Sequence, residues 1–425
     1  MASFRLRNLM ITTEKKGTNQ INKTSFPQRF GKYAEIKTTD YEFQFNLNGE
    51  VKSIRGLNMN WPHPSEILKR TDGNDWVYHS VGVSAGTGKI RELIGEYYLP
   101  CPSYPTNSVW SFNPYADTKV SQAFAAWYQL FGTLYEIRQQ NVPREVGEFI
   151  DLIITNDDST LLQKKEVLHT ILKGEISVLP PDTRYVDYDV IPLMISDGCN
   201  YHCDFCKVKT KLKFRTRSKE SILDQLNELK GYYGRNIENY TGLFLGNHDG
   251  LAADDSLIEW SASEAYERLG LKNSYSKNLK LFLFSSVDSL LNAGPGLFDW
   301  FEQSPYDTHL NIGFESVDET TLARIKKPIA VDKVRDAFDK MLVLNREYPS
   351  VEVTANFLLG EQLPEDHNRS LKQLLGDLPD SLPKKGTVYL SPLMGSTDTE
   401  SLLPLFYELK SESRLPTYLY LIQRL

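Results

Sequence analysis

The sequence predicts an α/β protein whose larger part is a parallel sheet covered by helices. Six strand-like segments alternate with helix-like segments after residue 185, and no such alternation precedes it. Strands that alternate with helices form parallel sheets with right-handed crossovers. Several of these strands are nearly continuous apolar runs, as expected for strands buried on both faces. Six such units fit an open barrel or a doubly wound sheet, and in either fold ligands bind at the carboxyl ends of the strands.

The expected elements follow one another in strand–helix pairs. We place strands at 189–196, 240–246, 278–286, 309–316, 351–360 and 386–394. We place helices at 218–234, 256–270, 296–303, 332–348 and 365–378, with a last helix beginning near 396. Ser218 and Gly234 are expected to cap the first helix, because a serine hydroxyl accepts from free amides at a helix start and glycine adopts the conformations that end a helix.

The first 185 residues predict a separate, irregular α+β domain. The stretch 41–57 reads as two strands around an Asn-Gly turn, and helices are expected at 120–140 and further on up to 174. Prolines in "LPPDTRY" (179–185) break the chain and mark the domain boundary. Residues 1–185 are therefore expected to cap the second domain or bind substrate, residues 186–400 to form that second domain, and 401–425 to form a helical extension.

Composition limits the class of protein. The chain has 425 residues, of which 40% are hydrophobic, and a formal net charge of −7. We find no run of about 18 apolar residues, and the first residues are too polar for a secretory signal. A cytoplasmic protein without a membrane span is therefore expected. The acidic balance argues against nucleic acid as a partner.

Three of the four cysteines lie together in "CNYHCDFCKV", directly after the first predicted strand. Cys199, Cys203 and Cys206 have the spacing C-x3-C-x2-C. Thiolates grouped in this way suit an iron–sulfur cluster or zinc. Structural zinc takes four ligands, commonly from two short pairs, and the sequence offers no second pair of that kind. Zinc remains the alternative interpretation of this motif.

The motif, with Phe205 before its last cysteine, resembles the signature of the radical S-adenosylmethionine enzymes. The resemblance covers roughly residues 187–400 and implies a partial (β/α)6 TIM-like barrel. It implies that the three cysteines bind a [4Fe–4S] cluster whose fourth iron takes the amino and carboxylate groups of S-adenosylmethionine. It further implies reductive cleavage of that cofactor to a 5′-deoxyadenosyl radical, which abstracts hydrogen from a substrate.

A glycine-containing stretch after the second strand extends the resemblance. "LFLGNHDGL" (243–251) is similar to the family loop that receives the methionine amino group. That similarity makes Gly246, Asn247 and Asp249 candidate cofactor residues. Asn247 stands where the family often has an acidic residue, so Asp249 and the carbonyl of Gly246 are the candidate acceptors. The alternative is an ordinary polar turn between strand and helix.

The segment "NIGFESVDETTLARIKKP" (311–328) resembles the stretch after the fourth strand in the Elp3- and MiaB-like branch of the family. By that likeness Glu315 accepts from the ribose hydroxyls or the amino group, and Arg324 or Lys326 pairs with the methionine carboxylate. The alternative is a solvated helical face, made of Asp318, Glu319, Arg324 and Lys327.

Further site residues follow from the same resemblance. Ser285 ends the third strand at the expected barrel mouth, and Asn356 and Leu358 lie in the fifth strand, which resembles the family segment that runs along the adenine. The backbone of Phe205 is expected against the adenine edge. Cys101, the remaining cysteine, is either a hydrogen donor to a substrate radical or a free structural thiol.

The functional hypotheses are three. The first is a radical S-adenosylmethionine enzyme with one cluster, acting on a small molecule or peptide, with an electron donor such as flavodoxin or ferredoxin. A second cysteine-ligated cluster would need about three more cysteines, and only Cys101 remains. The second hypothesis is a radical enzyme that modifies RNA. The third is a zinc-stabilised binding protein without catalytic activity.

Overall fold

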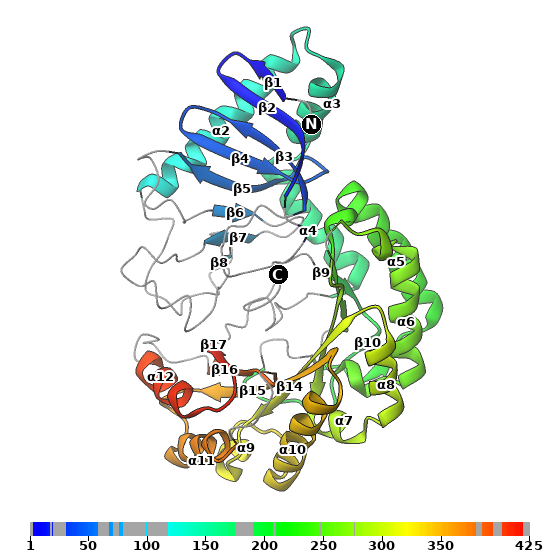
Figure 1. Ribbon diagram of the computed structural model, residues 1–425, viewed down its shortest axis with the longest axis vertical. Helices are drawn as coiled ribbons and strands as arrows, with labels where there is room; N and C mark the ends of the chain where they lie inside the picture. Colours follow the sequence, from blue (N-terminus) through cyan, green and yellow to red (C-terminus); the bar gives the residue numbers. More distant parts are fainter. Residues whose placement is uncertain are drawn as a thin grey trace.

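The computed structural model describes two connected units (Figure 1). The described residues are 3–17, 19, 31–57, 68–70, 76–79, 99–100, 118–174, 190–206, 210–246, 248–275, 277–379, 385–393 and 402–419. Cys101, Asn247 and the predicted boundary at 179–185 lie outside the described residues.

The larger unit is a seven-stranded parallel sheet in which every strand pairs with the next along the chain. Its strands are β9 (Val190–Leu193), β12 (Gly242–Leu245), β13 (Lys280–Ser286), β14 (Asp307–Glu315), β15 (Val351–Leu359), β16 (Val388–Pro392) and β17 (Thr417–Leu419). A sheet that adds each strand on the same side winds in one direction, as a barrel does, whereas a doubly wound sheet reverses. The predicted partial barrel is therefore confirmed.

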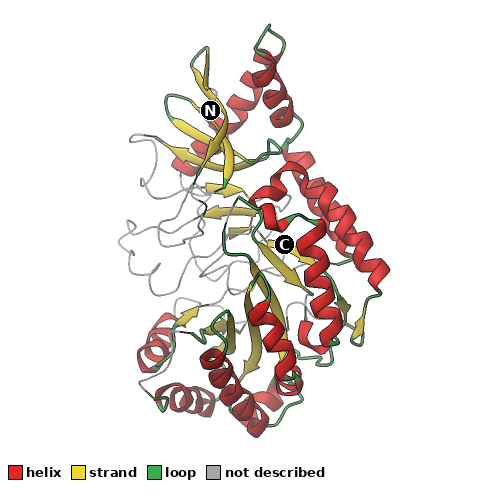
Figure 2. Cartoon of the chain, turned by 45° about the vertical axis from the view of Figure 1, so that its right-hand side comes forward, coloured by secondary structure: helices red, strands yellow, loops and turns green. Residues whose placement is uncertain are grey.

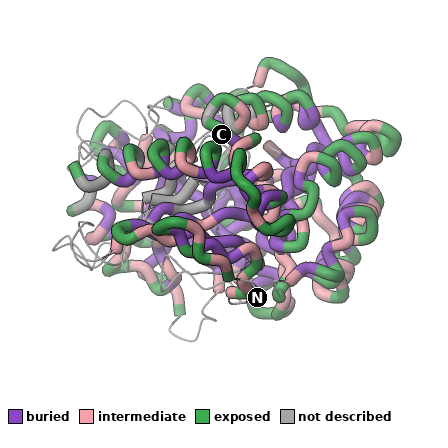
Figure 3. The backbone as a smooth tube through the Cα atoms, turned by 90° about the horizontal axis from the view of Figure 1, so that it is seen from above, coloured by how far each residue is buried: buried purple, intermediate pink, exposed green. Residues whose placement is uncertain are grey.

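Helices line the outside of this curved sheet (Figure 2), and the buried segments run inside them (Figure 3). They are α5 (Lys219–Tyr233), α6 (Asp255–Arg268), α7 (Val287–Asn292), α8 (Pro295–Gln303), α9 (Glu319–Arg324), α10 (Val331–Glu347), α11 (Glu365–Gly376) and α12 (Leu402–Glu412), with short 3-10 turns η5 (Gly234–Asn239), η6 (Gly250–Ala252) and η7 (Leu271–Asn273).

Strand β15 shows that the two faces of the sheet differ: one packs under the helices, and the other lines the inside of the barrel. All nine of its residues are buried. Val353 and Phe357 belong to the apolar core beneath the helices, and burial of one such side chain contributes roughly 1.5–3 kcal/mol. On the alternate face Thr354 accepts a hydrogen bond from Asn311 of β14 at 2.9 Å, and Asn356 accepts one from Ser391 of β16 at 2.7 Å. The face turned away from the helices is thus polar, which an apolar run does not predict.

Most elements of the barrel match the prediction, including the caps Ser218 and Gly234 of α5. The main differences concern short elements. The first predicted strand ends at Leu193, and the next residues form the separate short strand β10 (Ser196–Asp197). Helix α7 was not predicted. The segment after 401 contains α12 but also β17, which joins the sheet beside β16, so this segment is not a purely helical extension.

The smaller unit contains an eight-stranded antiparallel sheet in simple chain order, more regular than predicted. Its strands are β1 (Ser3–Leu6), β2 (Leu9–Lys16), β3 (Lys32–Lys37), β4 (Tyr41–Phe45), β5 (Val51–Gly56), β6 (Leu68–Arg70), β7 (Trp76–His79) and β8 (Leu99–Pro100). Helices α2 (Thr118–Arg138), α3 (Arg144–Ile154) and α4 (Asp158–Leu172) follow. Phe43 and Phe45 of β4 pack against Trp127 of α2, which joins this sheet to its helices.

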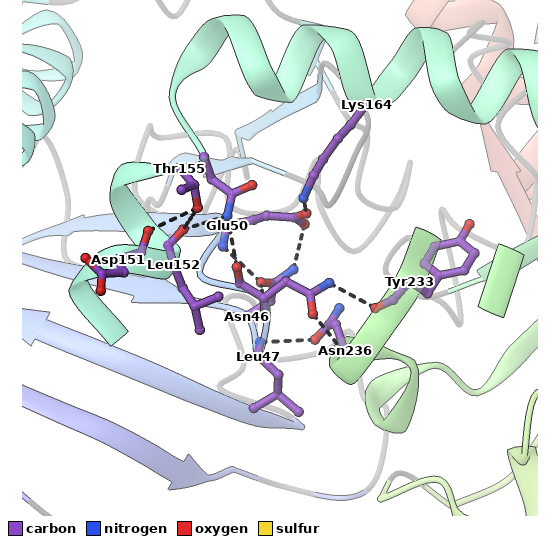
Figure 4. A network of polar contacts seen from close by, with 11 residues as sticks. Asn46, Leu47, Glu50, Asp151, Leu152, Thr155, Lys164, Tyr233 and Asn236 are labelled. Atoms are coloured by element: carbon purple, nitrogen blue, oxygen red, sulfur yellow. Dashed lines mark hydrogen bonds and ion pairs between the residues drawn. The ribbon is translucent and has the colours of Figure 1, made fainter. Parts of the chain in front are cut away.

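Hydrogen bonds hold the β4–β5 turn against the start of the barrel (Figure 4). The Asn48 side chain donates to the carbonyl oxygen of Tyr233 in α5 at 2.9 Å. The backbone amide of Leu47 donates to Asn236 at 3.4 Å. Amide side chains satisfy the backbone groups at this contact without burying net charge.

Among the residues described, none of the helices combines the length and the apolar character needed to cross a membrane.

Candidate metal and cofactor site

The three cysteines lie on a loop that leaves the carboxyl end of β9 and returns to α5. Strand β10 pairs with β11 (Arg215–Thr216) and closes the base of this loop. The Arg217 guanidinium donates to the Asp197 carboxylate across the same base at 2.5 Å. The amide of Cys199 donates to the carbonyl oxygen of Leu212 on the returning segment at 3.3 Å. The strand pair, the ion pair and the backbone hydrogen bond together hold the two ends of the loop close to each other.

Gly198 is the residue that lets the two ends of this loop approach. Its φ is +80°, and a Cβ built there would lie 2.2 Å from the backbone oxygen of Lys213. We expect Gly198→Ala to lower the thermal unfolding temperature and to reduce metal uptake, because strained left-handed backbone costs about 1–3 kcal/mol and the returning segment must shift. Gly294→Ala is the control, since no atom lies within 4 Å of its Cβ position. Equal unfolding temperatures for the two variants would contradict this.

The cysteine thiols are largely withdrawn from solvent. Cys203 is buried, and Cys199 and Cys206 are half-buried. Burial raises the pKa of Cys203 to about 11, while the charge of Lys327 acts in the opposite direction. Burial also raises the pKa of Cys199, and a hydrogen bond from the amide of Tyr201 to its sulfur opposes that rise. Without metal these groups are thiols at neutral pH, and metal binding must release their protons.

The donor set fits a multinuclear cluster. In the part of the chain that the structure describes, no three His, Cys, Asp or Glu side chains converge on a single metal-ion position. Thiolates of an iron–sulfur cluster bind different irons and need not converge on one point. The amide of Cys206 donates to the carbonyl oxygen of Cys203 at 3.3 Å, so these two cysteines belong to one tight turn of the loop.

A buried ion pair lies beside the thiols at the end of β14. Lys327 Nζ lies 3.1 Å from Glu315 Oε1 and donates to the carbonyl oxygen of Gly313 at 2.6 Å. The side chains of Lys327 and Glu315 are only 4% and 7% exposed. Glu315 has a φ of +66°, a rare conformation for a residue other than glycine. Such backbone strain clusters at functional sites.

Glu315 retains an unused acceptor. Its Oε2 is buried and makes no hydrogen bond within the described residues. Leaving a buried charged oxygen without a partner costs about 1–3 kcal/mol or more. Gly313 makes room for this carboxylate, since a Cβ built there would lie 2.5 Å from Glu315 Oε1. A buried acceptor of this kind suits a hydrogen-bond donor supplied by a ligand.

The structure places the neighbouring cations differently from Lys327. Arg324 is exposed and donates to the carbonyl oxygen of Gln362 at 2.7 Å. Lys326 is also exposed and pairs with Asp204 of the cysteine loop at 2.5 Å. The alternative that placed Lys327 on a solvated helical face is wrong, because helix α9 ends at Arg324 and the chain then turns Lys327 inward.

Asp249 and Ser285 contact each other at the ends of β12 and β13. The buried Asp249 carboxylate accepts from Ser285 Oγ and Ser286 N, both at 3.3 Å, and from Ser289 Oγ at 2.8 Å. These bonds hold the loop after β12 against the start of α7. Gly246 sits at the head of that loop with a φ of +78°, and its amide donates to the carbonyl oxygen of Leu193 at 2.9 Å.

The remaining predicted residues lie toward the same end of the sheet, where the strands have their carboxyl ends. Asn356 is bonded to Ser391, as described above, and Phe205 is half-buried against the main core. The carbonyl oxygen of the buried Leu358 accepts from His367 Nε2 at 3.0 Å. A carbonyl only accepts, so Nε2 carries the proton, and in the neutral ring Nδ1 accepts from the Ser316 hydroxyl at 2.8 Å.

This histidine predicts a pH dependence of stability. Burial lowers the pKa of His367 below its ordinary 6.5, while the Leu358 carbonyl and the charge of Asp318 act against that. The unfolded chain therefore takes up the proton first, so stability is intact above pH 6.5 and falls as the pH drops below it. We expect the unfolding free energy of the metal-free protein to fall by up to about 1.4 kcal/mol more per pH unit than that of His367→Gln. Parallel pH profiles would contradict this.

Comparison with known proteins identifies the domain that carries this site. Residues 193–374 match the radical SAM superfamily. The ribosomal protein uS12 methylthiotransferase RimO of Alteromonas mediterranea is 23% identical over 239 residues, covering 52% of this chain and 44% of that protein. RimO of Cellvibrio japonicus is 21% identical over 249 residues, covering 55% and 50%. The chain thus spans about half the length of these curated relatives. The crystal structure of Streptococcus suis SuiB is 11% identical with a TM-score of 0.38, covering 90% of this chain and 71% of that one.

Proposed function

We propose, from the premise that residues 193–374 belong to the radical SAM superfamily, that this chain is an enzyme with one [4Fe–4S] cluster. It binds S-adenosylmethionine and removes a hydrogen atom from a small-molecule or peptide substrate. The observation that carries the proposal is a cysteine loop beside a buried ion pair: Lys327 Nζ lies 5.3 Å from the ring centre of Tyr201 in that loop, and its partner carboxylate has an unused oxygen.

Cys199, Cys203 and Cys206 would hold the cluster. When bound, the cluster and S-adenosylmethionine supply one-electron cleavage of the sulfonium, which produces a carbon radical able to take hydrogen from an unreactive C–H bond. The protein's part is to bind, orient and exclude water.

Three of this chain's groups would bind the cofactor directly. Lys327, a buried cation, would pair with the methionine carboxylate, a role that the sequence suggested for Arg324 or Lys326. Glu315 Oε2 would accept from the amino group or the ribose hydroxyls. The Gly246 carbonyl is the candidate acceptor at the β12 end, because Asp249 is already occupied by serines.

The remaining predicted contacts concern the adenosine part. The backbone of Phe205 and residues Asn356 and Leu358 would line the adenine, and Ser285 would support the loop through Asp249. Ser285, Asn356 and Leu358 lie in the carboxyl-terminal halves of β13 and β15, and Phe205 lies on the loop after β9. The carboxyl ends of the strands are where α/β folds bind ligands.

Two observations favour a peptide or small molecule over RNA as substrate. The net charge is −7, which disfavours binding to a phosphate backbone. The curated relatives are named for action on a ribosomal protein, which is a polypeptide. Within this sequence only Cys101 remains after one cluster, so we propose a single cluster and no sulfur transfer from a second.

The test is anaerobic reconstitution with iron and sulfide, followed by S-adenosylmethionine and a strong reductant. We expect a brown protein that produces methionine and 5′-deoxyadenosine, with reduced flavodoxin or ferredoxin able to replace the chemical reductant. A colourless protein that contains about one zinc per chain would instead support a zinc-stabilised binding protein. Intact cluster without cleavage of the cofactor under any reductant would overturn the proposal.

A further inference from the structure

Tyr201 occupies a distinctive place between the first two cysteines of the loop. Its backbone amide donates to Cys199 Sγ at 3.3 Å. Its hydroxyl donates to Asp288 Oδ2, a group on a different element, α7. Lys327 Nζ lies 5.3 Å from the centre of its ring. One residue therefore connects a thiol to two charged groups outside the loop.

Asp288 is itself held in place. Lys333 of α10 lies 2.6 Å from its other carboxylate oxygen, Oδ1. The pKa of Asp288 is lowered, because hydrogen bonds from Lys333 and Tyr201 outweigh partial burial. Asp288 is thus an ionised acceptor, and hydrogen bonds to ionised acceptors are roughly twice as strong as neutral ones.

A tyrosine fixed at both its hydroxyl and its ring has little freedom at its backbone. The direction of the Tyr201 amide toward Cys199 is therefore set in part by Asp288 and Lys327. Hydrogen bonds to cysteine sulfur are one of the features that set the reduction potential of an iron–sulfur cluster. They stabilise the reduced cluster more than the oxidised one, because the reduced cluster carries more negative charge.

We propose that Tyr201 and Asp288 are positioning residues that raise the reduction potential of the cluster by aligning the Tyr201 amide with the Cys199 sulfur. This inference rests on the proposed cluster. It gives two residues that do not bind the cluster a role in its one-electron reduction. Neither residue needs to touch S-adenosylmethionine or substrate for this role.

The experiment is a potentiometric titration of the reconstituted protein without S-adenosylmethionine or substrate, followed by the electron paramagnetic resonance signal of the reduced cluster. In Tyr201→Phe we expect the ratio of reduced to oxidised cluster at a fixed potential to fall about tenfold, a shift of about 59 mV for one electron. Asp288→Asn keeps an acceptor oxygen but weakens the hydrogen bond from Tyr201, so a smaller fall in the potential is expected. Loss of a negative charge alone would raise the potential, so a fall in this variant reports the loss of alignment.

Tyr348→Phe is the matched control. The Tyr348 hydroxyl, directly after α10, donates to Asp299 of α8 at 3.1 Å, and neither residue belongs to the cysteine loop. Wild-type potentials in Tyr201→Phe and Asp288→Asn, or an equal shift in Tyr348→Phe, would overturn the inference. If Tyr201→Phe holds no cluster, Asp288→Asn decides by the same criterion. Absence of a cluster from the wild-type protein would instead refute the proposed function, and the inference with it.

Discussion

Replacing Lys327 with methionine is expected to destabilise the protein by about 3–5 kcal/mol and to abolish S-adenosylmethionine binding. The substitution leaves the Glu315 carboxylate buried without its cation, and removal of one partner of a buried ion pair has a cost of this size. It also removes the cation that we propose for the cofactor carboxylate. Denaturant unfolding of the metal-free protein measures the first effect, and equilibrium binding to the reconstituted protein measures the second.

Two further variants separate stability from binding. The double variant Glu315→Gln/Lys327→Met should recover most of the stability, because no uncompensated charge remains, but should not recover binding. Lys326→Met removes only an exposed ion pair with Asp204 and should cost less than about 1 kcal/mol. Loss of cofactor binding in Lys326→Met, with normal binding in Lys327→Met, would contradict the assignment and return the role to Lys326.

Replacing Cys203 with serine is expected to abolish cluster assembly while leaving the metal-free fold largely intact. Serine is close to cysteine in size, and the buried Cys203 thiol is neutral without metal, so the stability change should be about 1 kcal/mol. A hydroxyl at this position cannot replace the thiolate that the cluster needs. Iron and sulfide content after anaerobic reconstitution measures the effect.

Cys101→Ser is the control for this experiment, because Cys101 lies outside the C-x3-C-x2-C motif. It should bind as much iron as the wild-type protein. Full iron content in Cys203→Ser, or loss of iron in both variants alike, would mean that the motif does not hold the cluster.

The sequence predicted the barrel well because its signals are local and repeated. Apolar strands such as β13 and capped helices such as α5 each carry their own pattern. Short elements carry no such pattern of their own. Helix α7 has only six residues, and its start depends on the Ser286 hydroxyl accepting from the Ser289 amide. Strand β17 has only three residues, and it is a strand because it pairs with β16.

The cysteines could be predicted from spacing alone, whereas their surroundings could not. Lys326 and Lys327 are adjacent and chemically identical in sequence, and only the turn after α9 decides which of them is buried. Tyr201 and Asp288 are 87 positions apart, so their contact is a product of the fold. Gly313, two positions before Glu315, is the one residue whose type could have indicated the buried ion pair. A small residue at an inward position leaves room for a neighbouring carboxylate.

The most direct test of the proposed cluster and its open iron is electron paramagnetic resonance of the reduced, reconstituted protein with and without S-adenosylmethionine. We predict about four irons and four sulfides per chain and a reduced-cluster signal whose g values change when the cofactor is added, because in the proposed function the cofactor would bind the iron that has no cysteine ligand. A reduced cluster whose spectrum is unchanged at saturating S-adenosylmethionine would contradict the account.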